Sequence, residues 1–201
     1  MLAAEADLAQ RDPVLAGIIA TGGPCALGRR GHPSHFEALC RSIVFQQLAG
    51  RAAQAIWLRF RALVPGKLTA EGVLALDEAM LRAAGLSGAK ARSISDLAAH
   101  VADGRVHLQR MARRRDEDII GELSQVWGIG TWTAQMFLMF QLGRLDVWPV
   151  LDFGVRNGFA RLYGRATMPS AKELEPLGEQ FRPYRSIAAW YCWRAVDVVT
   201  I

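Results

Sequence analysis

Residues 126–134 read Val126-Trp127-Gly128-Ile129-Gly130-Thr131-Trp132-Thr133-Ala134. Apolar residues recur at helical spacing over 118–126, before the turn, and again from 134 to 142, after it. This spacing predicts two helices joined by a tight connection. Gly128 and Gly130 interrupt the pattern, and two glycines so close together permit positive φ and the close approach of another backbone. The segment therefore predicts a hairpin of two helices.

The amides at the start of the second helix give this turn an affinity for anions. The amides of Gly130, Thr131 and Trp132 would open that helix, where N–H groups have no intrahelical partner. The positive end of the helix dipole attracts phosphate to such groups. Taken alone, however, the turn is also typical of an ordinary connection between helices, in which glycine is common.

The sequence after the hairpin extends the pattern well beyond two glycines. Asp152 closes the segment Asp146-Val147-Trp148-Pro149-Val150-Leu151-Asp152 and stands 20 positions after Trp132. With the motifs Phe36-Glu37-Ala38-Leu39-Cys40-Arg41-Ser42-Ile43-Val44-Phe45-Gln46-Gln47 and Arg182-Pro183-Tyr184-Arg185-Ser186, the chain resembles the helix-hairpin-helix (HhH-GPD) superfamily of DNA glycosylases. Within that superfamily it is similar to the 3-methyladenine DNA glycosylase II branch, from about Asp12 to Trp193.

The resemblance implies an all-α fold in which two helical lobes flank a cleft for DNA and for an extruded base. We expect a single glycosylase domain over residues 1–201, with a central lobe over 34–145 that contains the hairpin 126–132. Residues 1–33 and 146–201 would form the terminal lobe. Because the helical match begins near Asp12, we expect a compact member without the N-terminal β domain of longer relatives.

Composition is consistent with a globular protein that binds an anionic partner. With 201 residues, of which 51% are hydrophobic, the chain can bury a substantial core, and disorder is not the expected class. The net charge of +5 would supply a sequence-independent part of DNA affinity, although charge alone is weak evidence. The partner implied by the resemblance is double-stranded DNA with damaged bases, bound by a monomer.

Cysteine and histidine usage argues against a metal site. Cys25, Cys40 and Cys192 contain no C-x-x-C pair, and the histidines lack ligand spacing. The resemblance requires no cofactor, although it allows a monovalent cation, Na⁺ or K⁺, on carbonyls of the hairpin. The sequence shows no membrane-spanning run and no leader, so we expect no membrane segment and a reduced, cytoplasmic location, nucleoid-associated in a bacterium.

Asp152 is the candidate catalytic residue. It follows Pro149-Val150-Leu151 and precedes a helical stretch that ends near Tyr163, so on local grounds it is a helix N-cap, a common use of aspartate. An N-cap carboxylate accepts amide hydrogen bonds and lies at the positive end of the helix dipole, which favours its charged form. The resemblance gives it a further role, in which it stabilises the oxocarbenium-like sugar as the base departs.

Trp132 indicates which reaction the carboxylate would assist. In related bifunctional glycosylases a nucleophilic lysine stands two positions after the second hairpin glycine, where this chain has Trp132. Because indole forms no Schiff base, we expect a monofunctional enzyme that leaves an abasic site. An alkylated purine is already cationic and leaves without protonation, so one carboxylate suffices. The indole face would also attract that cationic base, although core packing explains Trp132 equally well without the resemblance.

A base in duplex DNA is reached by flipping, with a side chain inserted in its place. The resemblance assigns this insertion to Gln47, although an ordinary exposed glutamine is the alternative. Ser87 and Lys90 match a second turn that contacts the minor groove or backbone, with helix capping and a solvated charge as alternatives. Tyr184 and Phe45 are expected to line the base pocket. The hairpin contacts to DNA are expected from Gly128, Gly130, Thr131 and Thr133.

Capping signals divide the rest of the chain into helices. Thr69, Asp77 and Ser87 are predicted N-caps, Pro13 suits a first helical turn, Gly85 is a predicted stop, and Ser170 to Glu173 a capping box. Pro176 should kink or delay the helix that follows. Trp190 and Trp193 share one face of the last helix and are expected to be buried supports. The predicted helices cover 14–20, 34–47, 51–63, 118–126 and 186–200, and 21–33 connects the lobes.

Two departures from the family pattern leave the choice of base open. Leu151 stands where many relatives have a second acid, and Phe153 where some have tyrosine. A glycosylase for deaminated or oxidised bases is therefore an alternative to an alkylpurine enzyme. Two classes of protein without catalytic activity also stay open. One is a non-catalytic helix-hairpin-helix clamp, against which Asp152 and Trp132 argue, and the second is a helical interaction protein whose positive charge is incidental.

Overall fold

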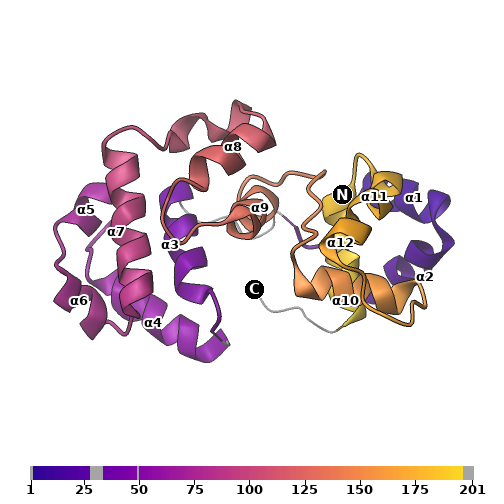
Figure 1. Cartoon of the computed structure of the whole chain (residues 1–201), viewed down its shortest axis with the longest axis horizontal. Coiled ribbons are helices and arrows are strands. Elements are labelled where there is room, and N and C mark those ends of the chain that lie inside the picture. Colours follow the sequence, from indigo (N-terminus) through magenta and orange to yellow (C-terminus); the bar gives the residue numbers. More distant parts are fainter. Residues whose placement is uncertain (1, 28–33, 49, 197–201) are drawn as a thin grey trace. The chain divides into compact units, whose positions relative to one another are not determined.

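The computed structural model describes residues 2–27, 34–48 and 50–196, and every regular element in these ranges is a helix (Figure 1). This confirms the all-α class. In the described part of the chain, no helix has the length and apolarity that a membrane crossing requires. The helices are α1 (Leu2–Arg11), α2 (Pro13–Gly22), α3 (His35–Phe45), α4 (Gly50–Ala62), α5 (Ala70–Leu74), α6 (Glu78–Ala83), α7 (Gly88–Ala102), η1 (Leu108–Arg113), α8 (Asp116–Leu123), α9 (Thr131–Phe140), α10 (Phe153–Leu162), α11 (Ala171–Leu177), η2 (Glu179–Phe181) and α12 (Arg185–Ala195).

The chain forms two compact units. The terminal unit comprises Met1–Arg30 and Leu138–Ile201, and the central unit comprises Gly31–Phe137. The sequence suggests a boundary near residue 145, whereas the contacts place it after Phe137, within α9. The end of α9 belongs with the terminal unit because Phe140 stacks on Trp193 of α12, with ring centroids 5.7 Å apart. The single glycosylase domain over the whole chain stays a prediction.

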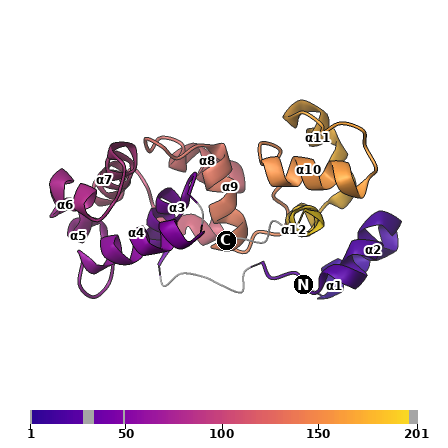
Figure 2. The ribbon, with the colours of Figure 1, turned by 90° about the horizontal axis from the view of Figure 1, so that it is seen from below.

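In the central unit, several helices pack against α7. Helices α5 and α6 lie beside it, and α3 contacts both α7 and α4 (Figures 1 and 2). Ile94, Leu97 and Ala98 of α7 are fully buried. The predicted caps are confirmed, because the side chains of Thr69, Asp77 and Ser87 each accept an amide hydrogen bond at the start of α5, α6 and α7.

In the terminal unit, α10 crosses α12 at very short range (Figures 1 and 2). A Cβ atom at Gly158 of α10 would lie 1.9 Å from the carbonyl oxygen of Cys192 in α12, so only glycine fits at this crossing. Asp12 is the cap of α2, and its Oδ1 accepts from the amides of Val14 and Leu15. Its Oδ2 accepts from the Tyr163 hydroxyl at 2.6 Å, which ties α2 to the end of α10.

Several predicted helix ends are wrong by a few residues. Helix α3 ends at Phe45, so Gln47 lies in a turn rather than in a helix. Helix α8 covers 116–123 rather than 118–126, and α12 ends at Ala195 rather than at 200, although residues 197–201 lie outside the described ranges. Helix α1 precedes Asp12 and was not predicted.

The capping box of α11 is confirmed, since Ser170 and Glu173 bond reciprocally. Pro176 does not delay the start of this helix. The helix begins at Ala171 and ends one residue after the proline, where the missing N–H has little helix left to disturb. In the predicted connection 21–33, α2 includes 21 and 22, and residues 28–33 lie outside the described ranges.

Candidate functional site

Asp152 is the N-cap of α10 and lies in the terminal unit. Its Oδ1 accepts from the Val155 amide at 2.8 Å and from the Trp193 indole Nε1 at 2.8 Å. The residue is 9% exposed, so both bonds are formed largely out of water. A carboxylate at a helix start that accepts from two N–H donors is fixed in position. The predicted cap is therefore confirmed, and it holds the carboxylate in one orientation.

The packing of Trp193 and Asp152 leaves no room for a side chain at position 154. A Cβ atom at Gly154 would lie 2.7 Å from Cδ1 of Trp193 and 3.1 Å from Oδ1 of Asp152, so glycine allows the indole to approach the carboxylate. Cys192 precedes Trp193 and is buried. Burial and the nearby Asp152 raise the pKa of the Cys192 thiol well above its usual range, so the thiol stays neutral beside the carboxylate.

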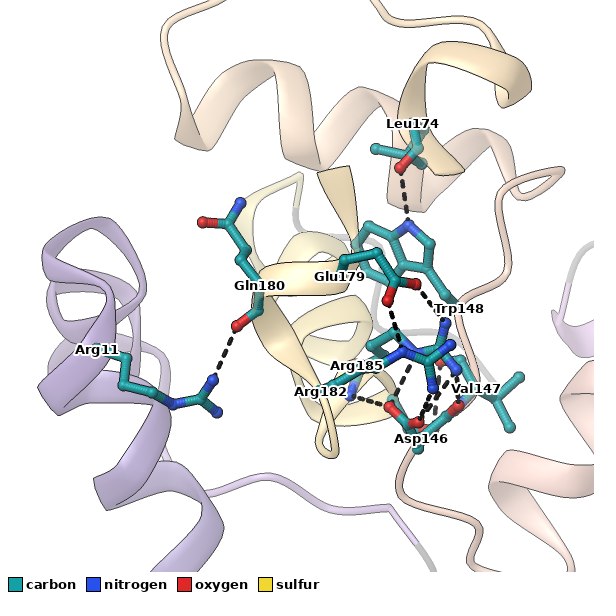
Figure 3. Close-up of polar contacts among 10 residues, drawn as sticks. Arg11, Asp146, Val147, Trp148, Leu174, Glu179, Gln180, Arg182 and Arg185 are labelled. Atoms are coloured by element: carbon teal, nitrogen blue, oxygen red, sulfur yellow. Dashed lines mark hydrogen bonds and ion pairs between the residues drawn. The ribbon is translucent and has the colours of Figure 1, made fainter. Parts of the chain in front are cut away.

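The segment before Asp152 is anchored by a cluster of arginines (Figure 3). Arg185 donates from Nε to Asp146 Oδ1 at 2.8 Å, and Arg182 donates from Nη1 to Asp146 Oδ2 at 2.7 Å. Two residues further on, the Trp148 indole donates to the Leu174 carbonyl at 3.0 Å. Because of these bonds, the loop that leads to Asp152 has little freedom to shift.

Two exposed apolar side chains flank the buried carboxylate. Leu151 is 56% exposed and Phe153 is 67% exposed, whereas Asp152 between them is 9% exposed. Both apolar side chains therefore face solvent. Their place beside Asp152 makes them candidates for contact with a large ligand.

The predicted hairpin connects α8 to α9 in the central unit. The first bond of the α9 ladder runs from the Ala134 amide to the Gly130 carbonyl at 3.1 Å. The amides of Thr131 and Thr133 therefore precede that ladder, in the arrangement that attracts phosphate. Gly128 has a φ of 82°, as predicted. Gly130 does not have a positive φ, because it serves only as the start of α9.

The hairpin lies close against α7. A Cβ atom at Gly128 would lie 2.1 Å from Ser93 Oγ, so the glycine is needed for close approach as well as for its positive φ. Asp96 of α7 accepts from the Trp127 amide at 2.7 Å. Arg92 of α7 lies over the Trp127 ring, 4.5 Å from its centroid. Helix α7 thus orients the turn that carries the anion-binding amides.

A pocket of about 370 Å³ opens at the hairpin. It brings together four of the predicted site residues with one residue that was not predicted, Gln46. Gln46 donates from Nε2 to the Gly128 carbonyl and to Thr133 Oγ1, at 3.1 Å each. Thr133 is 4% exposed, so its hydroxyl serves this bond rather than a surface contact. The pocket is lined by Gln46, Gln47, Gly128, Trp132 and Thr133.

The remaining predicted residues have separate surroundings. Ser87 is exposed and caps α7 through its hydroxyl. The Lys90 ammonium donates to the carbonyls of Val44 and Gln46, at 2.7 Å each, and burial lowers its pKa. Phe45 lies under the Arg41 guanidinium, 3.9 Å from the ring centroid. Tyr184 is half-buried at the start of α12, in the terminal unit with Asp152.

No metal centre is formed by the described side chains, since no three histidine, cysteine, aspartate or glutamate residues among them converge. All three cysteines are buried, and none of them forms a disulfide within the described ranges. Two hairpin carbonyls already accept hydrogen bonds, that of Val126 from the Ile129 amide and that of Gly128 from Gln46. The monovalent cation at the hairpin stays a prediction.

Comparison with known proteins assigns the family. Residues 40–183 match the HhH-GPD superfamily base excision DNA repair protein family. The chain belongs to this superfamily. The match covers the hairpin and Asp152 and includes the loop anchored by the arginine cluster.

Several proteins that are similar to this chain are named for 3-methyladenine. The chain is 35% identical to DNA-3-methyladenine glycosylase 1 of Schizosaccharomyces pombe over 79% of its length and 71% of that protein. It superimposes on the S. pombe 3-methyladenine DNA glycosylase in complex with abasic DNA with a TM-score of 0.86 and 30% identity, covering 98% and 97% of the two chains. For a DNA-3-methyladenine glycosidase from Bacillus halodurans, the TM-score is 0.84 at 37% identity, covering 95% and 87%.

Sequence reasoning missed the partner of the catalytic candidate. Trp193 is buried, as expected of a support, but its indole also donates to Asp152. A buried tryptophan needs an acceptor for its N–H, which was the available signal. Which acceptor it finds depends on the crossing of α10 and α12. Gln46 was missed because nothing in the sequence distinguishes it from Gln47.

Proposed function

We propose that this protein is a DNA glycosylase that removes alkylated purines of the 3-methyladenine and 7-methylguanine class from duplex DNA. The observation that carries the proposal is the carboxylate of Asp152, held by Val155 and Trp193 at the start of α10. The chain belongs to a base-excision superfamily, and relatives similar to it are named for 3-methyladenine.

Asp152 would act on the sugar rather than on the base. As the N-glycosidic bond lengthens, positive charge develops on the deoxyribose, and a fixed carboxylate stabilises it without having to reorganise. An N3- or N7-alkylated purine carries its own positive charge and leaves as a neutral base. No second acid is then needed to protonate the leaving group. This agrees with Leu151, rather than an acid, beside Asp152.

Water completes the proposed reaction. Trp132 lines the pocket at the hairpin and has no amine for a Schiff base, so the sugar would be attacked by water and an abasic site would remain. The same indole presents a π face to a cationic base in this pocket. Hydrolysis without strand cleavage is the outcome that this residue supports.

The hairpin and Gln47 would hold the DNA. The α9 amides beside Gly130 and Thr131 suit a phosphate, and the net charge of +5 adds an electrostatic attraction that salt weakens. Gln47 is exposed at the rim of the pocket, as an inserted side chain requires. Affinity for duplex DNA should therefore fall steeply with salt, and a salt-independent affinity would favour an interaction protein whose charge is incidental.

The proposal is tested by measuring which bases the protein releases. Methylated duplex DNA should yield free 3-methyladenine and 7-methylguanine, detected by chromatography, and a panel of duplexes with single defined lesions gives the range. Release of only deaminated or oxidised bases would replace the alkylpurine proposal with a glycosylase for those lesions. Tight binding without release of any base would indicate a non-catalytic clamp.

Replacing Trp193 with phenylalanine should slow excision by roughly tenfold or more, because a hydrogen bond to a charged group is lost. Phenylalanine keeps a ring against Phe140 while removing the N–H that holds Asp152. Single-turnover excision should fall while DNA affinity stays near the wild-type value. Trp190→Phe, on the same helix, is the control, since the indole that bonds Asp152 is that of Trp193. Equal rates for the two variants would contradict the positioning of Asp152 by Trp193.

The hairpin cation can be tested through DNA affinity. If K⁺ or Na⁺ is held by hairpin carbonyls, duplex affinity should depend on the identity of the monovalent cation at constant ionic strength. Titration of duplex binding in KCl, NaCl and a large organic cation chloride measures this. Identical affinities in the three salts would remove the cation from the proposal.

A further inference from the structure

Gln47 has an unusual backbone conformation. Its φ is 56°, and it is the only non-glycine residue with positive φ among residues 2–27, 34–48 and 50–196. A side chain with a Cβ adopts this left-handed region at a cost, and it persists where the surroundings impose it. Gln47 is also exposed, so packing of its own side chain is not what imposes the conformation.

Lys90 holds the backbone just before Gln47. Its ammonium lies 2.7 Å from the carbonyl oxygen of Val44 and 2.7 Å from that of Gln46. These carbonyls belong to the end of α3, where helical acceptors lack partners and the helix dipole is negative. Lys90 itself is fixed in the first turn of α7, which Ser87 caps. The Lys90 ammonium therefore donates to both carbonyls from a fixed position on α7.

Gln46 holds the same turn from the other side. Its backbone N–H donates to the carbonyls of Ser42 and Ile43 at the end of α3, while its side chain reaches the hairpin. Nε2 donates to the Gly128 carbonyl, and because a carbonyl only accepts, the orientation of this amide group is determined. The residue before Gln47 is thus bonded through its backbone nitrogen, its carbonyl oxygen and its side chain.

We propose that Lys90 and Gln46 are positioning residues for base flipping, which hold Gln47 in its left-handed conformation at the rim of the pocket beside Trp132. The inference rests on the proposed function, in which Gln47 enters the DNA stack. Without these bonds, φ of Gln47 relaxes to negative values and the side chain leaves the pocket rim. Insertion then requires the turn to be ordered again at each encounter.

The position of the ammonium distinguishes this role from the DNA contact that the sequence suggests for Lys90. A lysine that neutralises a phosphate contributes about one unit to the slope of log affinity against log salt. A lysine that bonds two carbonyls of its own chain contributes none, and its loss affects flipping instead. Flipping requires least energy when the damaged base is unpaired, so the effect of a positioning residue should shrink on such a substrate.

The experiment compares Lys90→Met with Lys67→Met, a matched control at an exposed lysine. Single-turnover release of 7-methylguanine is measured in two duplexes of the same sequence, one with cytosine and one with an abasic site opposite the lesion. Lys90→Met should be roughly tenfold slower opposite cytosine, because charge-assisted bonds are lost, and close to wild type opposite the abasic site. Its salt slope should equal that of the wild type, and Lys90→Arg, which can still donate to both carbonyls, should recover most of the rate.

Gln46→Leu provides a second variant with the same expected pattern, and melting temperatures show whether each variant is folded. The proposal is overturned if Lys90→Met slows release equally opposite cytosine and the abasic site, if it behaves like Lys67→Met, or if its salt slope falls by about one unit. A wild-type protein that releases 7-methylguanine from neither duplex contradicts the proposed function instead, so the two failures are distinguishable.

Discussion

The variant Asp152→Asn is expected to lose excision of alkylated purines by at least about a hundredfold, because the charge facing the developing sugar cation is removed. The fold should survive the change. Asparagine is as good an N-cap as aspartate, and its carbonyl oxygen still accepts from Val155 and Trp193. Duplex affinity should stay similar or rise, since a negative charge beside the phosphates disappears. Single-turnover release and equilibrium binding, measured on the same duplex, separate these effects.

Asp77→Asn is the matched control for this experiment. Asp77 caps α6 by accepting from the Met80 amide at 2.7 Å, and it is not part of the site. The two substitutions make the same chemical change at the same kind of helix position. Excision should therefore be lost in one variant and kept in the other. Comparable activity of both variants would show that the charge at Asp152 does not carry the reaction.

Gly158→Ala is expected to give the largest loss of stability among the glycine substitutions. Its Cβ would lie 1.9 Å from the Cys192 carbonyl oxygen and 2.4 Å from its carbonyl carbon, and backbone has no rotamer with which to move aside. Helices α10 and α12 must then separate, at a cost of about 1–3 kcal/mol. For a chain of this size, each kcal/mol lowers the melting temperature by about 2–4 °C. Thermal unfolding followed by circular dichroism measures the shift.

Gly121→Ala, within α8, is the control for this prediction. A Cβ atom there meets nothing within 4 Å, so the better helix propensity of alanine should raise stability by about 0.5–1 kcal/mol. Because α10 begins after Asp152 and α12 carries Trp193, Gly158→Ala should also slow excision. An unchanged melting temperature for Gly158→Ala would show that the two helices do not cross as closely as described.

The starts of helices were the most predictable part of the fold. Thr69, Asp77 and Ser170 each accept from an amide three residues away, so the signal is contained in a few neighbouring residues. The ends were less predictable because they depend on distant residues. Helix α3 ends at Phe45, and the Val44 carbonyl in its last turn accepts from Lys90, whose position in the sequence gives no hint of this contact.

The candidate site was predictable to the extent that family resemblance reaches. Local sequence identifies Asp152 as a helix cap, and the resemblance adds a reaction. Its partner Trp193 is 41 residues away, and the bond between them exists because α10 and α12 cross at Gly158. Contacts of this kind depend on tertiary packing, which neither spacing nor periodicity records.

Lys90 shows the same dependence on tertiary packing. In the sequence it is a basic residue after a turn, which suits a phosphate contact or a solvated charge. In the structure its ammonium bonds the carbonyls of Val44 and Gln46. The sequence does not distinguish a lysine that bonds carbonyls at the end of a helix from one that contacts DNA, whereas the structure does.

The most direct test of the proposed enzyme uses a duplex with one 7-methylguanine in an end-labelled strand. After incubation with the wild-type protein, the sample is divided, and one half is treated with hot alkali before electrophoresis. We expect a strand break at the lesion only in the alkali-treated half, because hydrolysis leaves an abasic site and Trp132 supplies no amine. An intact strand in both halves, beyond the alkali background of the untreated duplex, would contradict glycosylase activity.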